Sequence, residues 1–307
     1  MKKTVKKRAF VSAIAMLIVS AIALTSSTFA WFSMSKKATV EQMDLSVTSP
    51  EGILVSANAN AWTSALTVDQ LFPEEGSNDR MNAYDGNHNL LPGDLKPVSC
   101  AFRRYNDGYP SFYGGSLNDQ GTGRFTLINQ RTSTADAAGF VAFDLFVKLA
   151  ENKTVYFDES TFEDTSGQKT LTCLRVAFQQ MQTFPITADA ETITSTNVNG
   201  TTKMLEVDAI NRSDDAAASG KANGKETTYY LDYDGIISVN SDYVLPLSTQ
   251  TSATLITGDQ NRSAKSLNLN AGITKFRIYI WIEGNDIDCR NSIGGGTLAV
   301  NLAFTID

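Results

Sequence analysis

Histidine is almost absent from this sequence, since the chain of 307 residues contains only His88. A zinc hydrolase of the H-E-x-x-H type needs two histidines at helical spacing, so this class is excluded. A Ser-His-Asp triad would need His88 as its base, but His88 lies in the turn-rich stretch "DGNHNLLPGD" and no G-x-S-x-G sequence is present. Neither a Walker sequence nor a G-x-G-x-x-G following a strand is found. We therefore expect no catalytic residues, no cofactor and no enzymatic activity.

Acidic residues are missing from the first 30 positions, which hold five basic residues near the start and then an uncharged run from Ala9 to Leu24. A basic region, an apolar region and a small residue at Ala30 are the layout of a secretory signal peptide. We expect signal peptidase to cleave after Ala30, so that the mature chain begins at Trp31. The alternative is that residues 9–25 stay uncleaved as a membrane anchor, because the apolar run approaches the length that spans a bilayer.

The remaining chain carries an excess of acidic side chains. Without residues 1–30, which hold five of the 26 basic residues and none of the 33 acidic ones, the net charge is about −12. Such a surface favours solubility and disfavours nucleic acid or anionic lipid as a partner. Cysteine is scarce as well: Cys100, Cys173 and Cys289 are an odd set that allows one bridge or none.

Helical periodicity is also lacking, whereas several segments alternate with the period of two that is typical of strands. In "GFVAFDLFVKL", Val141 to Leu149 place their odd-numbered side chains on one face, with Asp144 and Lys148 on the other, which predicts a half-buried strand. "KFRIYIWIEG" and "TLAVNLAFTI" show the same pattern, and we expect them to form an antiparallel pair joined by residues 284–296. "GILVSA", "LTCLRVAFQ" and "TTYYLDYDGIISV" predict further strands, the last as a hairpin that turns at "DYDG".

These strands predict an all-β fold, a two-sheet β-sandwich or jelly roll with long surface loops. We expect residues 49–307 to form a single domain, because sandwiches of roughly 250 residues occur as one domain. The stretches 104–138 and 209–226 are rich in Gly, Asn, Asp, Ser and Ala, so we expect both to be irregular loops on the surface.

Two weak signals for binding sites remain. Glu283, Asp286 and Asp288 in "EGNDIDC" could offer oxygen ligands to calcium, although they lack the spacing of an EF-hand, and a turn rich in Asp and Asn needs no metal. Tyr279 and Trp281 point away from the core face of their strand. They either form an exposed contact face, for a glycan or a protein, or are covered by one of the long loops.

The start of the mature chain, residues 31–48, contains an irregular strand. In "ATVEQMDLSVTS", Val40 falls on one parity whereas Met43, Leu45 and Val47 fall on the other, so the alternation slips at Glu41 and Gln42. A slip of this kind predicts a β-bulge, or a strand that serves two different sheets.

The run "TFAWF", followed by "KKATVEQMDLSV", resembles the start of the TasA and camelysin family of exported matrix proteins. "LLPGDLKP" is similar to the P-G-D turn of that family, and "IYIWIEGNDIDC" resembles the C-terminal part of exported proteins of Gram-positive bacteria. The resemblance implies a jelly roll that self-assembles into fibres of the biofilm matrix or cell surface. The protease activity described for camelysin is not carried over, because metal-ligand motifs are missing.

In such fibres, a mature N-terminal segment adds a strand to the sheet of the neighbouring subunit. The resemblance implies that Val40, Met43, Leu45 and Val47 would fill pockets of the acceptor. The alternative is that residues 37–48 form the first strand of their own domain. A different function, that of a surface adhesin or glycan-binding module without polymerisation, would use the long loops and Trp281.

Overall fold

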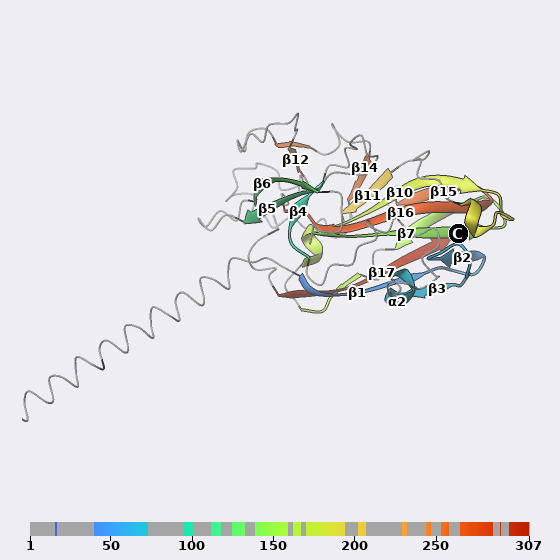
Figure 1. The fold of residues 1–307 in the computed structure, drawn as a ribbon, viewed down its shortest axis with the longest axis horizontal. Coiled ribbons are helices and arrows are strands. Elements are labelled where there is room, and N and C mark those ends of the chain that lie inside the picture. Colours follow the sequence, from blue (N-terminus) through green and yellow to red (C-terminus); the bar gives the residue numbers. More distant parts are fainter. Residues whose placement is uncertain are drawn as a thin grey trace, which may run out of the picture. The chain divides into compact units, whose positions relative to one another are not determined.

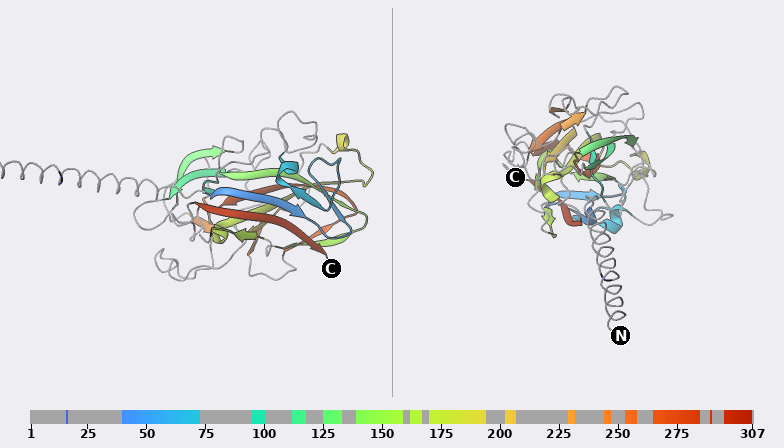
Figure 2. Two further views of the ribbon diagram at one scale, coloured as in Figure 1. Left: turned by 90° about the horizontal axis from the view of Figure 1, so that it is seen from below. Right: turned by 90° about the vertical axis from the view of Figure 1, so that its left-hand side faces the viewer.

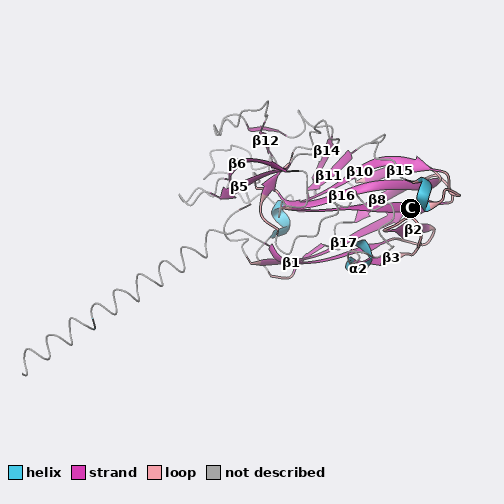
Figure 3. Cartoon of the chain, in the orientation of Figure 1, coloured by secondary structure: helices cyan, strands magenta, loops and turns pink. Residues whose placement is uncertain are grey.

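Strands dominate the structure, a computed structural model of the full chain, as Figure 3 shows. The description covers residues 16, 40–72, 95–100, 112–117, 125–132, 139–158, 162–166, 170–193, 202–206, 229–231, 244–246, 253–257, 265–284, 289 and 295–306. Residues 38–307 form one compact unit, separate from residues 1–37. Within the described residues, no helix is long and apolar enough to cross a membrane.

Two six-stranded sheets contain most of the described strands (Figure 1). Sheet A has the order β15 (Ser266–Leu269), β8 (Lys153–Asp158), β17 (Gly296–Ile306), β1 (Val40–Thr48) and β3 (Ala65–Thr67), with β9 (Phe162–Asp164) also paired to β17. Sheet B has the order β14 (Ala253–Thr257), β11 (Thr202–Glu206), β10 (Leu174–Phe184), β16 (Gly272–Ile282), β7 (Phe140–Leu149) and β2 (Ile53–Ser56).

Smaller elements complete the described part. A three-stranded sheet contains β4 (Val98–Ser99), β5 (Phe112–Leu117) and β6 (Phe125–Thr132), and a two-stranded sheet contains β12 (Tyr229–Leu231) and β13 (Val244–Pro246). The short helices are α2 (Val68–Leu71), η3 (Thr170–Cys173) and η4 (Ala190–Thr192).

A single apolar core lies between sheets A and B, which confirms the predicted β-sandwich. Phe157 of sheet A stacks on Phe178 of sheet B with ring centroids 3.7 Å apart. The alternation predicted for β17 is confirmed, because Leu298, Val300, Leu302 and Phe304 are all buried in this core while the intervening side chains are half-buried.

β1 lies in sheet A of its own domain, parallel to β17 and antiparallel to β3 (Figure 2). The pairing with β17 shifts between Val40 and Gln42, so Glu41 is an extra residue on the β1 side. The bulge predicted from the parity slip at Glu41 and Gln42 is therefore confirmed. β3 pairs only with Ser46–Thr48, and among the described residues no strand covers that edge of β1 ahead of Ser46.

Two predictions about β7 and β16 are wrong. Neither strand is half-buried: nine of the ten residues of β7 and all eleven of β16 are buried. The reason is that other segments cover the outer face of sheet B, the face turned away from the core. Among them is β5, whose Phe112 packs on Tyr279 and Trp281 of β16. Nor do β16 and β17 form an antiparallel pair, since β16 is paired on its two sides with β10 and β7, and β17 belongs to sheet A.

The prediction that residues 104–138 are irregular is also wrong in part. This stretch contains β5 and β6, which pair with each other, and β5 also pairs with β4. Alternating side chains were too few among its glycines and polar residues to predict strands. The stretch 209–226 and the turn at "DYDG" lie outside the described residues, and the described partner of β12 is β13.

Gly272, the first residue of β16, is a position where we expect a side chain to be costly. Its φ is +131°, and a Cβ added there would lie 2.3 Å from the backbone oxygen of Phe184. Backbone cannot move aside as a side chain can, so Gly272→Ala should lower the free energy of unfolding by about 3 kcal/mol. Chemical denaturation of the mature protein measures this change.

Gly52 provides the matched control for Gly272. It also has a positive φ, +89°, but an added Cβ would meet only the Lys153 Cε at 3.9 Å. Gly52→Ala should therefore cost only the backbone penalty of about 1–2 kcal/mol. Equal losses for the two variants would contradict the role assigned to the Phe184 carbonyl.

Candidate functional site

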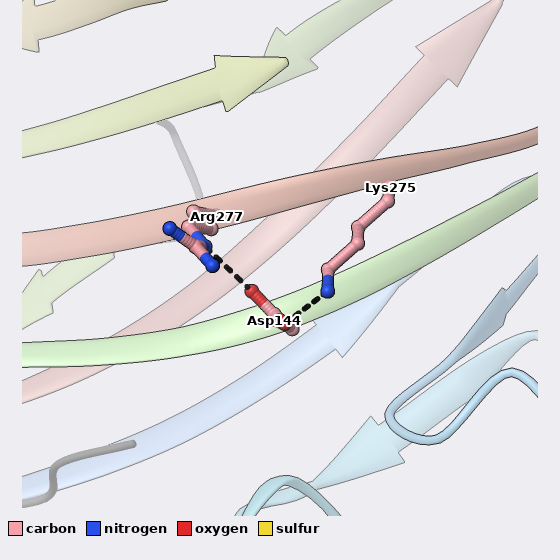
Figure 4. A network of polar contacts seen from close by, with 3 residues as sticks. All are labelled: Asp144, Lys275 and Arg277. Atoms are coloured by element: carbon pink, nitrogen blue, oxygen red, sulfur yellow. Dashed lines mark ion pairs between the residues drawn. The ribbon is translucent and has the colours of Figure 1, made fainter. Parts of the chain in front are cut away.

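A cluster of three charged side chains is buried on the outer face of sheet B: Asp144 from β7 with Lys275 and Arg277 from β16 (Figure 4). The Lys275 Nζ lies 2.9 Å from Asp144 Oδ2, and the Arg277 Nε lies 3.5 Å from Asp144 Oδ1. The exposed fractions of the three side chains are 0%, 4% and 3%, respectively. We call these residues the buried charge cluster.

The antiparallel register of β7 and β16 positions the cluster. Asp144 is directly opposite Arg277, whereas Lys275 is opposite Phe146 and reaches Asp144 along the diagonal. The Lys275 ammonium also lies over the Phe146 ring, 5.6 Å from its centroid. The pairing of two long interior strands of sheet B therefore holds each charge in place.

Burial raises the pKa of Asp144 above its ordinary value of 3.8, and the positive charges of Lys275 and Arg277 oppose this rise. The carboxyl group is thus held in surroundings that favour its uncharged form more than water does. Among the described residues, neither oxygen of Asp144 takes part in a hydrogen bond of good geometry, despite the short distance to Lys275.

Apolar groups lie beside the charge cluster on the same face of the sheet. One group is built on the stacked rings of Phe112 and Phe140, whose centroids are 3.9 Å apart. The other contains Ala59, Phe146, Ile193 and Ile273. Gln179, opposite Arg277 on β10, is also fully buried, and its amide makes no hydrogen bond with the described residues. The outer face of sheet B is therefore a second buried layer with polar groups in it.

The predicted contact face of Tyr279 and Trp281 belongs to this layer and is not exposed. Their exposed fractions are 1% and 0%, and Phe112 packs against both rings, with centroid distances of 5.8 Å to Tyr279 and 5.6 Å to Trp281. Of the two alternatives, coverage by the stretch 104–138 is therefore the one observed, and the covering residue Phe112 belongs to strand β5 of that stretch.

Glu283, one of the three calcium candidates, is buried and accepts hydrogen bonds from within the fold. Its Oε2 accepts from the Trp281 indole N–H at 3.1 Å and from the Cys100 backbone N–H at 3.4 Å. This role accounts for the acidic side chain without a metal. Asp286 and Asp288 lie outside the described residues, and in the part that is described no three His, Cys, Asp or Glu side chains gather as a metal ion requires.

The comparisons with known proteins add nothing to this geometry. No family model, curated protein or solved structure matches the chain.

Of the residues proposed for strand donation, Leu45 and Val47 are buried in the core between the sheets, with 3% and 0% of their surface exposed. Met43 is partly buried and packs against the same core. Val40 begins β1. The cleavage position at Ala30 and Trp31 and the lone His88 lie outside the described residues.

All three cysteines are buried thiols. The Cys173 Sγ lies 3.4 Å from the backbone oxygen of Thr170, and the Cys173 carbonyl accepts a hydrogen bond from the Glu283 N–H at 2.8 Å. Cys173 and Cys289 both belong to the core between the sheets. Burial in apolar surroundings protects such thiols from chemical reaction, so we assign them a packing role.

The sequence alone did not identify the buried charge cluster. The alternation of β7 places Asp144 on the outward face of its strand, and the alternation of "KFRIYIWIEG" places Arg277 outward in the same way. A signal was present, because Ala142 and Phe146 share the face of Asp144, and Tyr279 and Trp281 share the face of Arg277. A face that alternates charge with large aromatic rings is more typical of a covered surface than of a solvated one.

Proposed function

We propose that this chain is an exported structural protein that assembles into fibres of the cell surface or extracellular matrix, with β1 of one copy completing sheet A of the next. The observation that carries the proposal is the place of β1. It is the first strand of the unit 38–307, it pairs in parallel with the last strand, β17, and it contributes Leu45 and Val47 to the core. A first strand with these properties can be exchanged between identical subunits.

The contacts that β1 makes are available from a neighbour as well as from its own chain. Full burial of Leu45 and Val47 contributes about 1.5–3 kcal/mol each. Ordering each backbone residue of the strand costs roughly 1–2 kcal/mol, which is comparable to the gain from burial. The backbone hydrogen bonds between β1 and β17 must therefore supply the remaining stabilisation. A second copy would make the same contacts in the same groove, and exchange is therefore a low-cost route to assembly.

For exchange to occur, β1 would have to leave its pairing with β17 of its own chain, and further bonds at the end of β1 would have to open. Directly after β1, the Ser49 N–H donates at 2.9 Å to the oxygen of Ser64, the residue before β3. In the turn that leads into β2, the Ile53 N–H donates to the Pro50 oxygen at 3.2 Å. β3 adds three paired positions with Ser46–Thr48. These are the contacts that tie the end of β1 to the rest of its own chain on that side.

The competing function, a glycan-binding adhesin, has lost its main support. Trp281 was the aromatic platform that would have stacked on a sugar, and it is fully buried. An adhesin would have to bind through residues other than Tyr279 and Trp281.

Electron microscopy of the secreted protein tests the proposal. We expect the mature chain to start at Trp31, as N-terminal sequencing would report, and to form regular filaments whose number grows with protein concentration. A protein that stays monomeric at every concentration and binds glycan would contradict the proposal and support the adhesin.

A further inference from the structure

The buried charge cluster contains an amine and a carboxyl group in direct contact. Lys275 and Asp144 come from neighbouring strands, both side chains are almost fully buried, and the Lys275 Nζ is 2.9 Å from Asp144 Oδ2. Neither oxygen of the carboxylate is engaged in a hydrogen bond of good geometry with a described residue. The burial distinguishes this pair from a surface ion pair such as that between Lys153 and Glu151, whose charged atoms are 2.8 Å apart but whose carboxylate is 72% exposed.

We infer that Lys275 and Asp144 condense to an intramolecular amide, an isopeptide bond that joins β16 to β7. The Lys275 ammonium first gives a proton to the Asp144 carboxylate, which leaves an uncharged amine beside an uncharged acid. The Nζ lone pair then attacks Cγ, the Cγ–Oδ2 bond breaks, and Oδ2 leaves as water with two hydrogens that came from the ammonium group. One C–N bond forms, one C–O bond breaks, and no oxidant or co-reactant is needed.

The first reason for this inference is the positioning of the two groups. The register of β7 and β16 holds them on the same face at diagonal positions, so the attack is intramolecular and its entropy has been lost already in folding. The packing of Lys275 over the Phe146 ring limits the places that the amine can occupy.

The second reason is the electrostatic environment. Burial favours the uncharged acid and disfavours the ion pair, because removing both charges from water is costly. The amide product carries no charge, so its formation removes the buried charges of Lys275 and Asp144, while Arg277 stays charged. The Arg277 Nε, 3.5 Å from Asp144 Oδ1, is placed to stabilise the oxygen that becomes negative when the amine adds to Cγ.

The third reason is the exclusion of water from the site. The outer face of sheet B is covered around Asp144, whose side chain has no exposed surface. A condensation that releases water is favoured where water is scarce, and hydrolysis of the product is disfavoured there for the same reason.

The bond would have a mechanical consequence that is independent of fibre formation. It would join two neighbouring strands of sheet B, β7 and β16, across the 131 positions of sequence that separate Asp144 from Lys275. A covalent tie of this kind restricts the unfolded chain, as a disulfide does, and reducing agents cannot break it.

Mass spectrometry of the purified full-length mature protein tests the inference. After reduction, the wild-type chain should be lighter than its sequence mass by one water molecule, and a digest should contain a branched peptide that joins the segments around Asp144 and Lys275. Trypsin should fail to cleave after Lys275. A wild-type chain of full sequence mass that yields an unmodified Lys275 peptide would overturn the inference.

Lys275→Arg is the matched control, because arginine keeps the charge and the length but does not form this amide. Its mass should be the full sequence mass. Dehydration at an Asp-Gly step, such as Asp234-Gly235, also removes one water, but it would persist in Lys275→Arg. Persistence of the water loss in that variant would therefore overturn the assignment to Lys275. The wild-type peptide map decides the question even if the variant does not fold.

Discussion

Leu45→Asp is expected to lower the melting temperature of the mature protein strongly and to abolish filaments. Leu45 is 3% exposed and belongs to the core between the two sheets. The change removes a buried leucine side chain and forces a carboxylate into apolar surroundings, and the two effects together should cost about 4 kcal/mol or more. That loss is a large part of the total stability of roughly 5–15 kcal/mol that a domain has. Thermal melting followed by circular dichroism measures it.

Ser46→Asp is the control for this experiment. It places the same carboxylate one position further along β1, where the side chain is half-buried and points to the opposite face of sheet A. We expect its melting temperature to stay close to that of the wild type. If Leu45→Asp melts like Ser46→Asp, then β1 does not contribute to the core as described.

The faces of β17 and the bulge of β1 could be predicted because each depends on local alternation alone. In β17, one set of side chains is apolar and the other is small or polar, so the period of two identifies the core face directly. In β1, an extra residue changes the parity of every side chain that follows, and the change at Glu41 is visible in the sequence without knowledge of the partner.

The burial of the outer face of sheet B could not be predicted in the same way. A charged residue that faces solvent and a charged residue that faces a second layer of chain give the same alternating pattern. Asp144 and Arg277 differ from solvated residues only in that their face of sheet B is covered. Part of that cover, Phe112 against Tyr279 and Trp281, comes from a stretch poor in strand signals. The alternation with a period of two identified the core face, but it also assigned the charged residues of the candidate site to a solvent-exposed face.

The order of the strands in the two sheets could not be predicted from the sequence either. Strands that follow one another in the chain are usually neighbours in a sheet, which is why β16 and β17 were expected to pair. In this fold the chain crosses from sheet B to sheet A between them, and each strand is paired on both sides without the other. Such a crossing depends on long-range partners, and these are not encoded in the alternation of either strand.

A pair of cysteines at facing positions of β1 and β17 would report which chain supplies β1 in a filament. Asp44 is in register with Ala299, and both side chains lie on the face of sheet A that is turned away from the core. Neighbouring strands are close enough for a disulfide at such positions. The variant Asp44→Cys/Ala299→Cys is assembled under reducing conditions, oxidised, and run on a denaturing gel without reductant, with Ala299→Cys alone as the control.

If β1 is exchanged, the filament fraction of the double variant runs as a ladder of covalent oligomers, which collapses to the monomer when reductant is added. The control gives no ladder. If the filaments instead yield monomers with the new disulfide closed within each chain, then β1 stays in its own sheet and the proposed mode of assembly is wrong.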